Sequence, residues 1–199
     1  MPNTLPEALL GRISTRVAEQ MGLHFPRERW SDLERGLVSA ARAFKFDELE
    51  RCARWLLSSP LTKQQIEVLG SNLTIGETYF YRDRRYFEIL ENDVLPEIIR
   101  SRREDGRSIR IWSAGCCSGE EPYTIAVLLS RMIPDLADWN ITILGTDINL
   151  RSIEKGSAGV YGEWSFRDTP SWIRENYFRK AESKRYQIEP HIRRMVVFS

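Results

Sequence analysis

The chain has 199 residues, of which 42% are hydrophobic and 29% charged, and its formal net charge is +1 at pH 7. This near balance of charge argues against a nucleic-acid binder, which is usually distinctly basic, and no apolar run approaches the roughly 20 residues that span a membrane. The N-terminus lacks a basic-then-apolar signal pattern, and the three cysteines suit neither a disulfide framework nor a zinc site. We therefore expect a cytoplasmic protein that binds no metal and does not insert into a membrane.

Residues 1–72 predict a small helical domain of four segments. Apolar residues recur at four-residue steps in the first two segments, as in helices with one buried face. Gly22 is placed to end the first helix, and Ser31 or Asp32 to cap the second. The fourth helix is expected to begin at a Thr62 cap.

Residues 73–107 predict a linker and a connecting helix. The stretch from Thr78 to Asp83 is dense in aromatic residues and indicates a packed crossing segment. A helix is expected over about residues 84–100. Pro96 lies inside it, lacks an N–H group and is expected to kink or shorten it.

From residue 108 onward, predicted strands and helices alternate. Residues 109–112 predict a strand, which a Gly-rich turn joins to a helix that opens at Glu120. Residues 140–144 predict a second strand, and residues 150–158 a second helix. This order predicts a parallel, doubly wound sheet with its ligand at the C-terminal ends of the strands.

The last residues, about 178–199, predict a small antiparallel β-subdomain. Residues 186–188 alternate between apolar and polar side chains, and residues 192–198 also resemble a strand. We expect these two strands to pair as a hairpin joined near Pro190.

The Gly-rich turn and the acid after the second strand form a nucleoside-binding pattern. Gly115 and Gly119 let the backbone approach a ligand, and Asp147 stands where such folds place a carboxylate on ribose hydroxyls. The pattern is weak by itself, because both glycines are equally compatible with a tight turn that binds nothing.

Two adjacent carboxylates narrow the choice of ligand. In a dinucleotide site, a pyrophosphate docks on the free N–H groups at the helix N-terminus. Glu120 and Glu121 occupy that end here and would repel a diphosphate, which disfavours an NAD(P)-linked enzyme. The pair suits a cation, such as the ammonium group of S-adenosylmethionine (SAM), which has no phosphate. Alternatively, both carboxylates only interact with the helix dipole, worth about 0.3–1 kcal/mol each.

Three blocks of sequence resemble the CheR family, bacterial methyltransferases that esterify glutamates on chemoreceptor helices. They are Gly76–Asp83, Ile111–Tyr123 and Thr146–Ile148. The resemblance covers about residues 10–199. It implies an α/β protein with a small N-terminal helical domain, then an incomplete Rossmann-like, doubly wound SAM-dependent methyltransferase domain with a small antiparallel β-subdomain.

The resemblance also implies which residues form the site. Thr78 and Arg82 are expected to contact SAM from the linker, with Arg82 also near the transferred methyl group as the catalytic residue. Glu121 is expected at the methionine end, Asp147 at the ribose, and the turn at Gly115 against the cofactor.

The expected reaction, its protein substrate and the expected activity of this span follow from the same resemblance. The expected reaction methylates glutamates on the cytoplasmic helices of methyl-accepting chemoreceptors and yields S-adenosyl-L-homocysteine (SAH). The family's SAM domain continues beyond Ser199, so we expect this span to be inactive by itself. Gly76 stands where enteric-type members have an Asn. The alternative is a non-catalytic receptor-binding or regulatory module of the same family.

Overall fold

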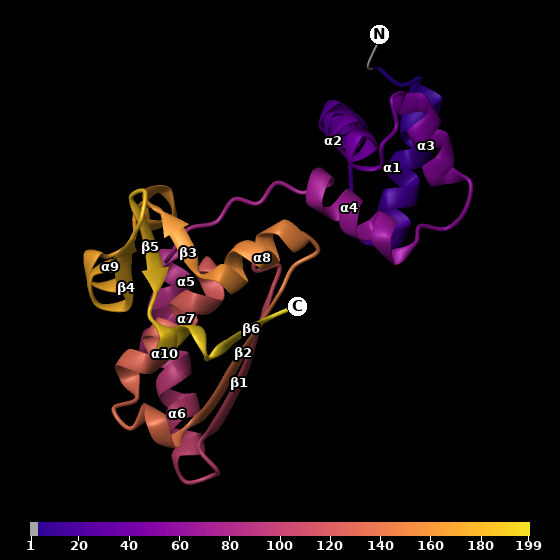
Figure 1. Cartoon of the computed structure of the whole chain (residues 1–199). Helices are drawn as coiled ribbons and strands as arrows, with labels where there is room; N and C mark the ends of the chain where they lie inside the picture. Colours follow the sequence, from indigo (N-terminus) through magenta and orange to yellow (C-terminus); the bar gives the residue numbers. More distant parts are fainter. Residues whose placement is uncertain (1–3) are drawn as a thin grey trace. The chain divides into compact units, whose positions relative to one another are not determined.

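The computed structural model describes residues 4–199, which divide into two compact units (Figure 1). The first comprises the residues up to Ile75 together with Ile148–Leu150, and the second comprises Gly76–Asp147 and Arg151–Ser199. The predicted linker and connecting helix therefore belong to the second unit from Gly76 onward. No helix within the described residues is long and apolar enough to cross a membrane.

The first unit is a helical bundle. Its elements are α1 (Glu7–Met21), the 3₁₀ turn η1 (Arg27–Arg29), α2 (Trp30–Ala43), α3 (Leu49–Leu57) and α4 (Lys63–Leu73). The apolar spacing is confirmed, because Ile13 and Val17 of α1 are buried in one cluster with Leu33 and Leu37 of α2. Burying one such side chain contributes roughly 1.5–3 kcal/mol.

Two of the three expected helix ends in this unit are confirmed. Gly22 ends α1 with φ 69°, a left-handed conformation that glycine adopts without strain. The Thr62 side chain accepts from the Gln65 N–H, and the Gln65 side chain accepts from the Thr62 N–H, so a full capping box starts α4.

The predicted cap of α2 is wrong. The helix begins at Trp30 with no side-chain cap, which places Ser31 and Asp32 inside its first turn. The reason is that η1 leads directly into the helix, and the Trp30 N–H bonds to the Arg27 carbonyl of that turn. Asp32 instead pairs with Arg29 and Arg35.

The expected helix near Pro96 is interrupted, as predicted. It consists of α5 (Arg84–Ile89), a π-helical turn η2 (Leu90–Val94) and α6 (Leu95–Arg103). Pro96 lies in the first turn of α6, directly after the π-helical turn, and has no N–H to donate to a carbonyl of that turn.

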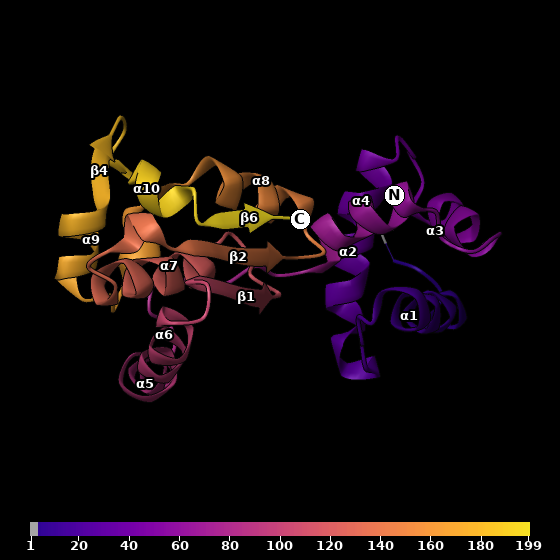
Figure 2. The ribbon, with the colours of Figure 1, turned by 90° about the horizontal axis from the view of Figure 1, so that it is seen from below.

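A parallel sheet forms the centre of the second unit, as predicted. Its strands are β1 (Ser108–Ala114), β2 (Asn140–Thr146) and β6 (Val196–Phe198), in the order β1-β2-β6 (Figure 2). Ser108 lies opposite Asn140, and Ile143 opposite Val196. The helices α7 (Glu120–Met132) and α8 (Leu150–Ala158) and the short turn η3 (Leu136–Asp138) complete this region.

The predicted C-terminal hairpin is wrong. A separate antiparallel sheet has the order β3-β5-β4, from β3 (Val160–Gly162), β5 (Arg185–Ile188) and β4 (Phe178–Ala181). The turn η4 (Glu163–Phe166) and the helix α9 (Ser171–Tyr177) lie between β3 and β4 in the chain. The last strand, β6, joins β2 instead.

A short helix explains this change of partner. After β5, α10 (Pro190–Arg193) redirects the chain to the main sheet, where the Ile143 N–H bonds to the Met195 carbonyl at 2.7 Å. Alternating side chains identify a strand but not its neighbour. The β-subdomain therefore runs from β3 to β5, rather than over residues 178–199.

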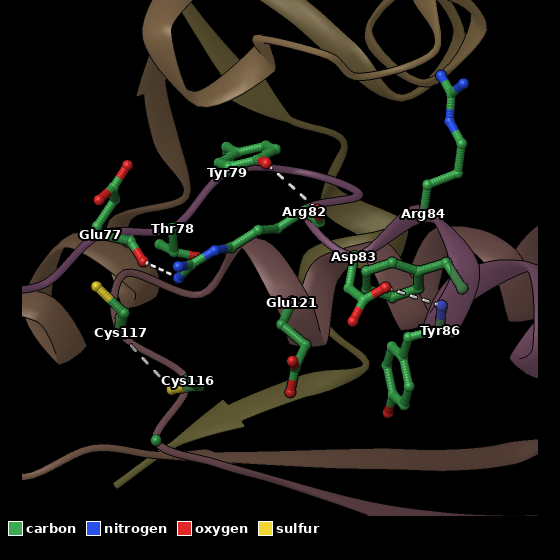
Figure 3. Close-up of a pocket in the computed structure, with 12 residues that line it drawn as sticks. Glu77, Thr78, Tyr79, Arg82, Asp83, Arg84, Tyr86, Cys116, Cys117 and Glu121 are labelled. Atoms are coloured by element: carbon green, nitrogen blue, oxygen red, sulfur yellow. Dashed lines mark hydrogen bonds between the residues drawn. The ribbon is translucent and has the colours of Figure 1, made fainter.

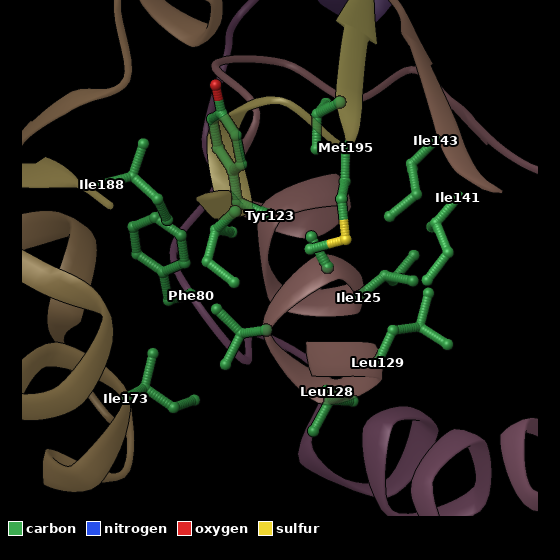
Figure 4. Close-up of a cluster of buried hydrophobic side chains, with 14 of the residues drawn as sticks. Phe80, Tyr123, Ile125, Leu128, Leu129, Ile141, Ile143, Ile173, Ile188 and Met195 are labelled. Carbon is green, nitrogen blue, oxygen red and sulfur yellow. The ribbon is translucent and has the colours of Figure 1, made fainter. Parts of the chain in front are cut away.

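Helix α7 is buried on nearly all sides. Figure 4 shows its apolar side chains between β2 on one side and Phe80, Ile173 and Ile188 on the other. Leu128 and Leu129 are fully buried. Because the helix is held on both sides, its N-terminus is fixed at the C-terminal end of β1.

Candidate functional site

A cavity of about 390 Å³ lies in the second unit where β1 ends (Figure 3). Its volume is in the range of small-molecule sites, roughly 300–1,000 Å³. One wall is formed by residues 77–79, 82–84, 86 and 87, the other by the turn of residues 115–117 together with Glu121. We refer to residues 78–83 as the crossing segment and to residues 115–119 as the β1–α7 loop.

Backbone hydrogen bonds from the end of β2 shape the β1–α7 loop. The N–H groups of Gly115 and Cys116 donate to the Thr146 carbonyl at 2.8 and 2.9 Å, and the Cys117 N–H donates to Asp147 Oδ2 at 2.8 Å. Cys117 has a φ of 48°, which is uncommon for a residue other than glycine and tends to occur at functional sites.

The two adjacent carboxylates of α7 point to different places. Glu121 lines the cavity, and Ser113 Oγ donates to its Oε1 at 2.6 Å. Glu120 is only 1% exposed and accepts from Ser118 Oγ and Ser165 Oγ. Of the two glutamates expected to form a cation-binding pair, only Glu121 therefore lines the cavity.

The crossing segment brings Arg82 to the opposite wall. Its guanidinium donates to the Glu77 carbonyl, and the Tyr79 hydroxyl donates to the Arg82 carbonyl at 3.3 Å. Figure 3 shows the Arg82 side chain extending towards Thr78 and Cys117, whereas the Arg84 side chain points away from them. Tyr81, just before Arg82, has a φ of 64°.

Four of the five predicted site residues line this one cavity: Thr78, Arg82, Gly115 and Glu121. The fifth, Asp147, does not line it but reaches the loop through its bond to Cys117. The structure thus brings the predicted set together around the end of β1, as expected where parallel strands end.

Sequence reasoning missed Tyr86, which lines the cavity together with Cys117. Tyr86 donates its N–H to Asp83 Oδ1 at 3.1 Å, so recognising Asp83 as an N-cap would have located it. Burial, and then the charges of Glu121 and Asp83, raise the pKa of Tyr86. Gly76 is packed closely here, because a Cβ on it would meet Cys117 Sγ at 2.7 Å.

The neighbouring thiol of Cys116 is not poised to react. Burial, and then the nearby charge of Asp147, raise the pKa of Cys116 to about 12. The thiolate is the nucleophilic form of cysteine, so this side chain stays protonated and unreactive at neutral pH. The loop therefore contributes backbone shape to the cavity rather than a cysteine nucleophile.

The charges on the two walls suit a zwitterion. Arg82 is a cation that can hold a carboxylate, and Glu121 is an anion that can hold an ammonium group. A Cβ on Gly115 would meet nothing within 4 Å, so this turn is open towards a ligand. These features fit the amino-acid end of SAM and disfavour a phosphate next to Glu121.

Comparisons with known proteins agree with this chemistry. Residues 76–199 match the family model described as CheR methyltransferase, SAM binding domain. The chain is 29% identical over 191 residues to the chemotaxis protein methyltransferase of Borreliella burgdorferi, covering 95% of the chain and 67% of that protein. It is 32% identical over 147 residues to a probable chemotaxis protein methyltransferase of Rhizobium etli, covering 72% of the chain and 54% of that protein.

A third relative, chemotaxis protein methyltransferase 2 of Vibrio cholerae, is 35% identical over 136 residues, covering 68% of the chain and 46% of that protein. The chain therefore spans between 46% and 67% of the lengths of these three relatives.

Proposed function

The chain belongs to the CheR methyltransferase family, whose SAM-binding domain matches residues 76–199, and we propose that the whole protein methylates glutamate side chains of chemoreceptors. The observation that carries this proposal is the cavity at the end of β1, where Arg82 and Glu121 face the same space from opposite walls. The relatives are named chemotaxis protein methyltransferases, which supports chemoreceptors as the substrate class.

The proposed contacts follow the charges of the site. Arg82 and Thr78 hold the carboxylate of the methionine part of SAM, and Glu121 holds its ammonium group. Asp147 accepts from the ribose hydroxyls. Gly115 allows the close approach of the ligand to the loop.

When bound, SAM supplies an electrophilic methyl group on a positively charged sulfur. A glutamate side chain has a reference pKa near 4.3, so at neutral pH it is already a nucleophile and needs no general base. Its carboxylate oxygen bonds to the methyl carbon while the carbon–sulfur bond breaks, and the electron pair of that bond stays on sulfur. The products are a glutamate methyl ester and SAH.

The chain's own residues then have two tasks, alignment and exclusion of water. We propose that Arg82, whose guanidinium has five N–H donors, also orients the acceptor carboxylate towards the methyl group while it holds the carboxylate of SAM. Its position at the wall opposite the β1–α7 loop supports this role.

Two measurements on the full-length protein test the proposal. Calorimetry with SAH and with NAD should show binding of SAH alone. Incubation with labelled SAM and receptor fragments should then give base-labile methyl esters on glutamates. SAH binding and receptor binding without any ester would instead support a non-catalytic module, and preferential NAD binding would overturn the assignment.

A further inference from the structure

Glu120 is a buried charge that does not face the cavity. It is the first residue of α7, is 1% exposed and is absent from the lining to which Glu121 contributes. A buried carboxylate is costly unless it is paired and hydrogen-bonded. Its partners therefore indicate what it stabilises.

Those partners come from three separate segments of the second unit. Ser118 Oγ of the β1–α7 loop donates to Glu120 Oε2 at 2.8 Å, and Ser165 Oγ of η4 donates to Oε1 at 3.0 Å. Lys155 Nζ of α8 lies 3.9 Å from Oε1 and donates to Ser118 Oγ at 3.3 Å. Each carboxylate oxygen has its own hydroxyl donor, and the charge has a cation beside it.

The first partner anchors the wall that carries Glu121. Besides its bond to Glu120, Ser118 accepts a hydrogen bond from the buried Tyr161 hydroxyl on its carbonyl oxygen at 2.8 Å. Both bonds hold the β1–α7 loop from behind, on the side away from the cavity. This fixes Gly115 and Cys117, which lie in the same loop.

The second partner anchors the wall that carries Arg82. The Ser165 carbonyl accepts from the Phe80 N–H at 2.8 Å, and the rings of Phe80 and Phe166 stack with centroids 5.0 Å apart. Thr169 Oγ1 also donates to the Phe80 carbonyl at 2.7 Å. The crossing segment is therefore held by the same short turn that donates to Glu120.

The backbone of Glu120 adds a further link to this wall. Thr124 Oγ1 donates to the Glu120 carbonyl at 2.7 Å and accepts from the Tyr81 N–H at 3.4 Å. Tyr81 has a positive φ, a strained conformation that its surroundings must maintain. The N–H groups of Phe80 and Tyr81, the two residues before Arg82, thus bond to residues that themselves contact Glu120.

We propose that Glu120 is a positioning residue that sets the separation between the two walls of the cofactor site. It does not contact the cofactor; it connects the β1–α7 loop to η4 and, through η4, to the crossing segment. Glu121 and Arg82 can then hold opposite ends of one amino-acid group. This inference rests on the proposed SAM site.

The test is a double-mutant cycle on the full-length protein, with SAH affinity measured by calorimetry. Glu120→Gln is introduced into the wild type and into Arg82→Ala, because glutamine keeps the side-chain volume and one acceptor. In the wild-type background we expect SAH binding to weaken about tenfold, as on losing a hydrogen bond to a charged group. In the Arg82→Ala background we expect a loss of about threefold or less, since one of the two positioned groups is already absent.

Glu97→Gln is the matched control, because Glu97 is exposed on α6; it should leave the affinity unchanged in both backgrounds. Ser165→Ala removes only the hydroxyl that joins η4 to Glu120, so it should weaken SAH binding in the same direction. A merely structural role would lower the melting temperature and weaken binding by the same factor in both backgrounds.

Equal factors in the two backgrounds, or unchanged affinity in both Glu120→Gln and Ser165→Ala, would overturn the inference while leaving the proposed function intact. Failure of the wild-type protein to bind SAH would overturn the proposed function itself. Thermal melts of every variant confirm that each is folded under the conditions of the titration.

Discussion

The Cys117 N–H donates to Asp147 Oδ2 at 2.8 Å, which joins the β1–α7 loop to the residue that follows β2. The carboxylate expected to bind the ribose therefore also holds the loop that forms one wall of the cavity. A hydrogen bond from a backbone N–H to a carboxylate is among the stronger kinds. Replacing Asp147 should thus change both the affinity for the ligand and the stability of the loop, and two different substitutions can separate these effects.

Asp147→Ala is expected to weaken SAH binding by about 1–3 kcal/mol, the usual cost of removing one partner of a buried hydrogen bond. Asp147→Asn keeps an oxygen that can accept from the Cys117 N–H but loses the charge offered to the ribose. We therefore expect the asparagine variant to melt near the wild-type temperature and still bind SAH more weakly. Calorimetry and thermal melts check this, and unchanged SAH affinity in Asp147→Ala would show that the ribose assignment is wrong.

Arg82→Lys is expected to transfer methyl groups much more slowly than the wild type. Lysine keeps the positive charge but not the planar fork that binds a carboxylate through two hydrogen bonds. Initial rates of methyl transfer by the full-length protein are the measurement. Arg100→Lys, at an exposed position on α6, is the control and should behave as the wild type. Near wild-type rates in Arg82→Lys would reduce Arg82 to a structural residue of the crossing segment.

Glu121→Gln is expected to discriminate between two ligands. It should weaken binding of SAH about tenfold, because glutamine is neutral and cannot form an ion pair with the ammonium group. Binding of 5′-methylthioadenosine, which has the nucleoside but no amino-acid group, should be unchanged. Competition calorimetry with the two ligands measures the difference. An equal loss for both would mean that Glu121 supports the cavity without contacting the amino-acid end.

The three cysteines are expected to differ in their reaction with iodoacetamide. Burial raises the pKa of Cys52 to about 11, and burial followed by the charge of Asp147 raises that of Cys116 to about 12. Both thiols should stay protonated and unreactive at pH 8, and react only as the pH rises towards those values. Cys117 is partly exposed and lines the cavity, so it should be alkylated first.

Mass spectrometry of the alkylated protein gives the site of reaction. Saturating SAH should slow the alkylation of Cys117, and Cys117→Ser should lose the fast phase altogether. The raised pKa values also act on stability, because the unfolded thiols ionise near pH 9. The free energy of unfolding should therefore be unaffected by these groups below pH 9 and should fall as the pH rises from 9 to about 12. Fast alkylation of Cys116 at pH 8 would contradict this account.

One face of the main sheet carries an exposed apolar row. Trp112, Leu144 and Val197 lie opposite one another in β1, β2 and β6, and they are 69%, 37% and 51% exposed. Parallel sheets are normally covered on both faces. Residues 1–199 produced by themselves are therefore expected to self-associate and to transfer little or no methyl group.

Sedimentation velocity over a range of concentrations measures this association. Trp112→Glu should shift residues 1–199 towards the monomer, because it replaces the most exposed side chain of the apolar row with a charge. Glu97→Gln, away from this row on α6, should not change the sedimentation. If wild-type residues 1–199 remained monomeric at high concentration, the apolar row would not cause self-association.

Much of the fold was accessible from local sequence signals. The first two helices of the first unit follow from four-residue apolar spacing, and Thr62 and Gly22 mark helix ends because capping depends on residues close in the chain. The alternation after Ser108 likewise predicted the parallel pair β1 and β2 with α7 between them. These features depend on interactions within a few residues, or within one strand–helix–strand unit.

Only the tertiary structure decided the partner of β6 and the separate directions of Glu120 and Glu121. Residues 196–198 have the pattern of a strand in either sheet, and the turn of α10 is what brings them beside β2. Glu120 and Glu121 are adjacent in the sequence, but successive residues on a helix point about 100° apart. Which of the two faces the cavity depends on how α7 is rotated, and that rotation is set by the apolar side chains that pack it between β2 and the β-subdomain.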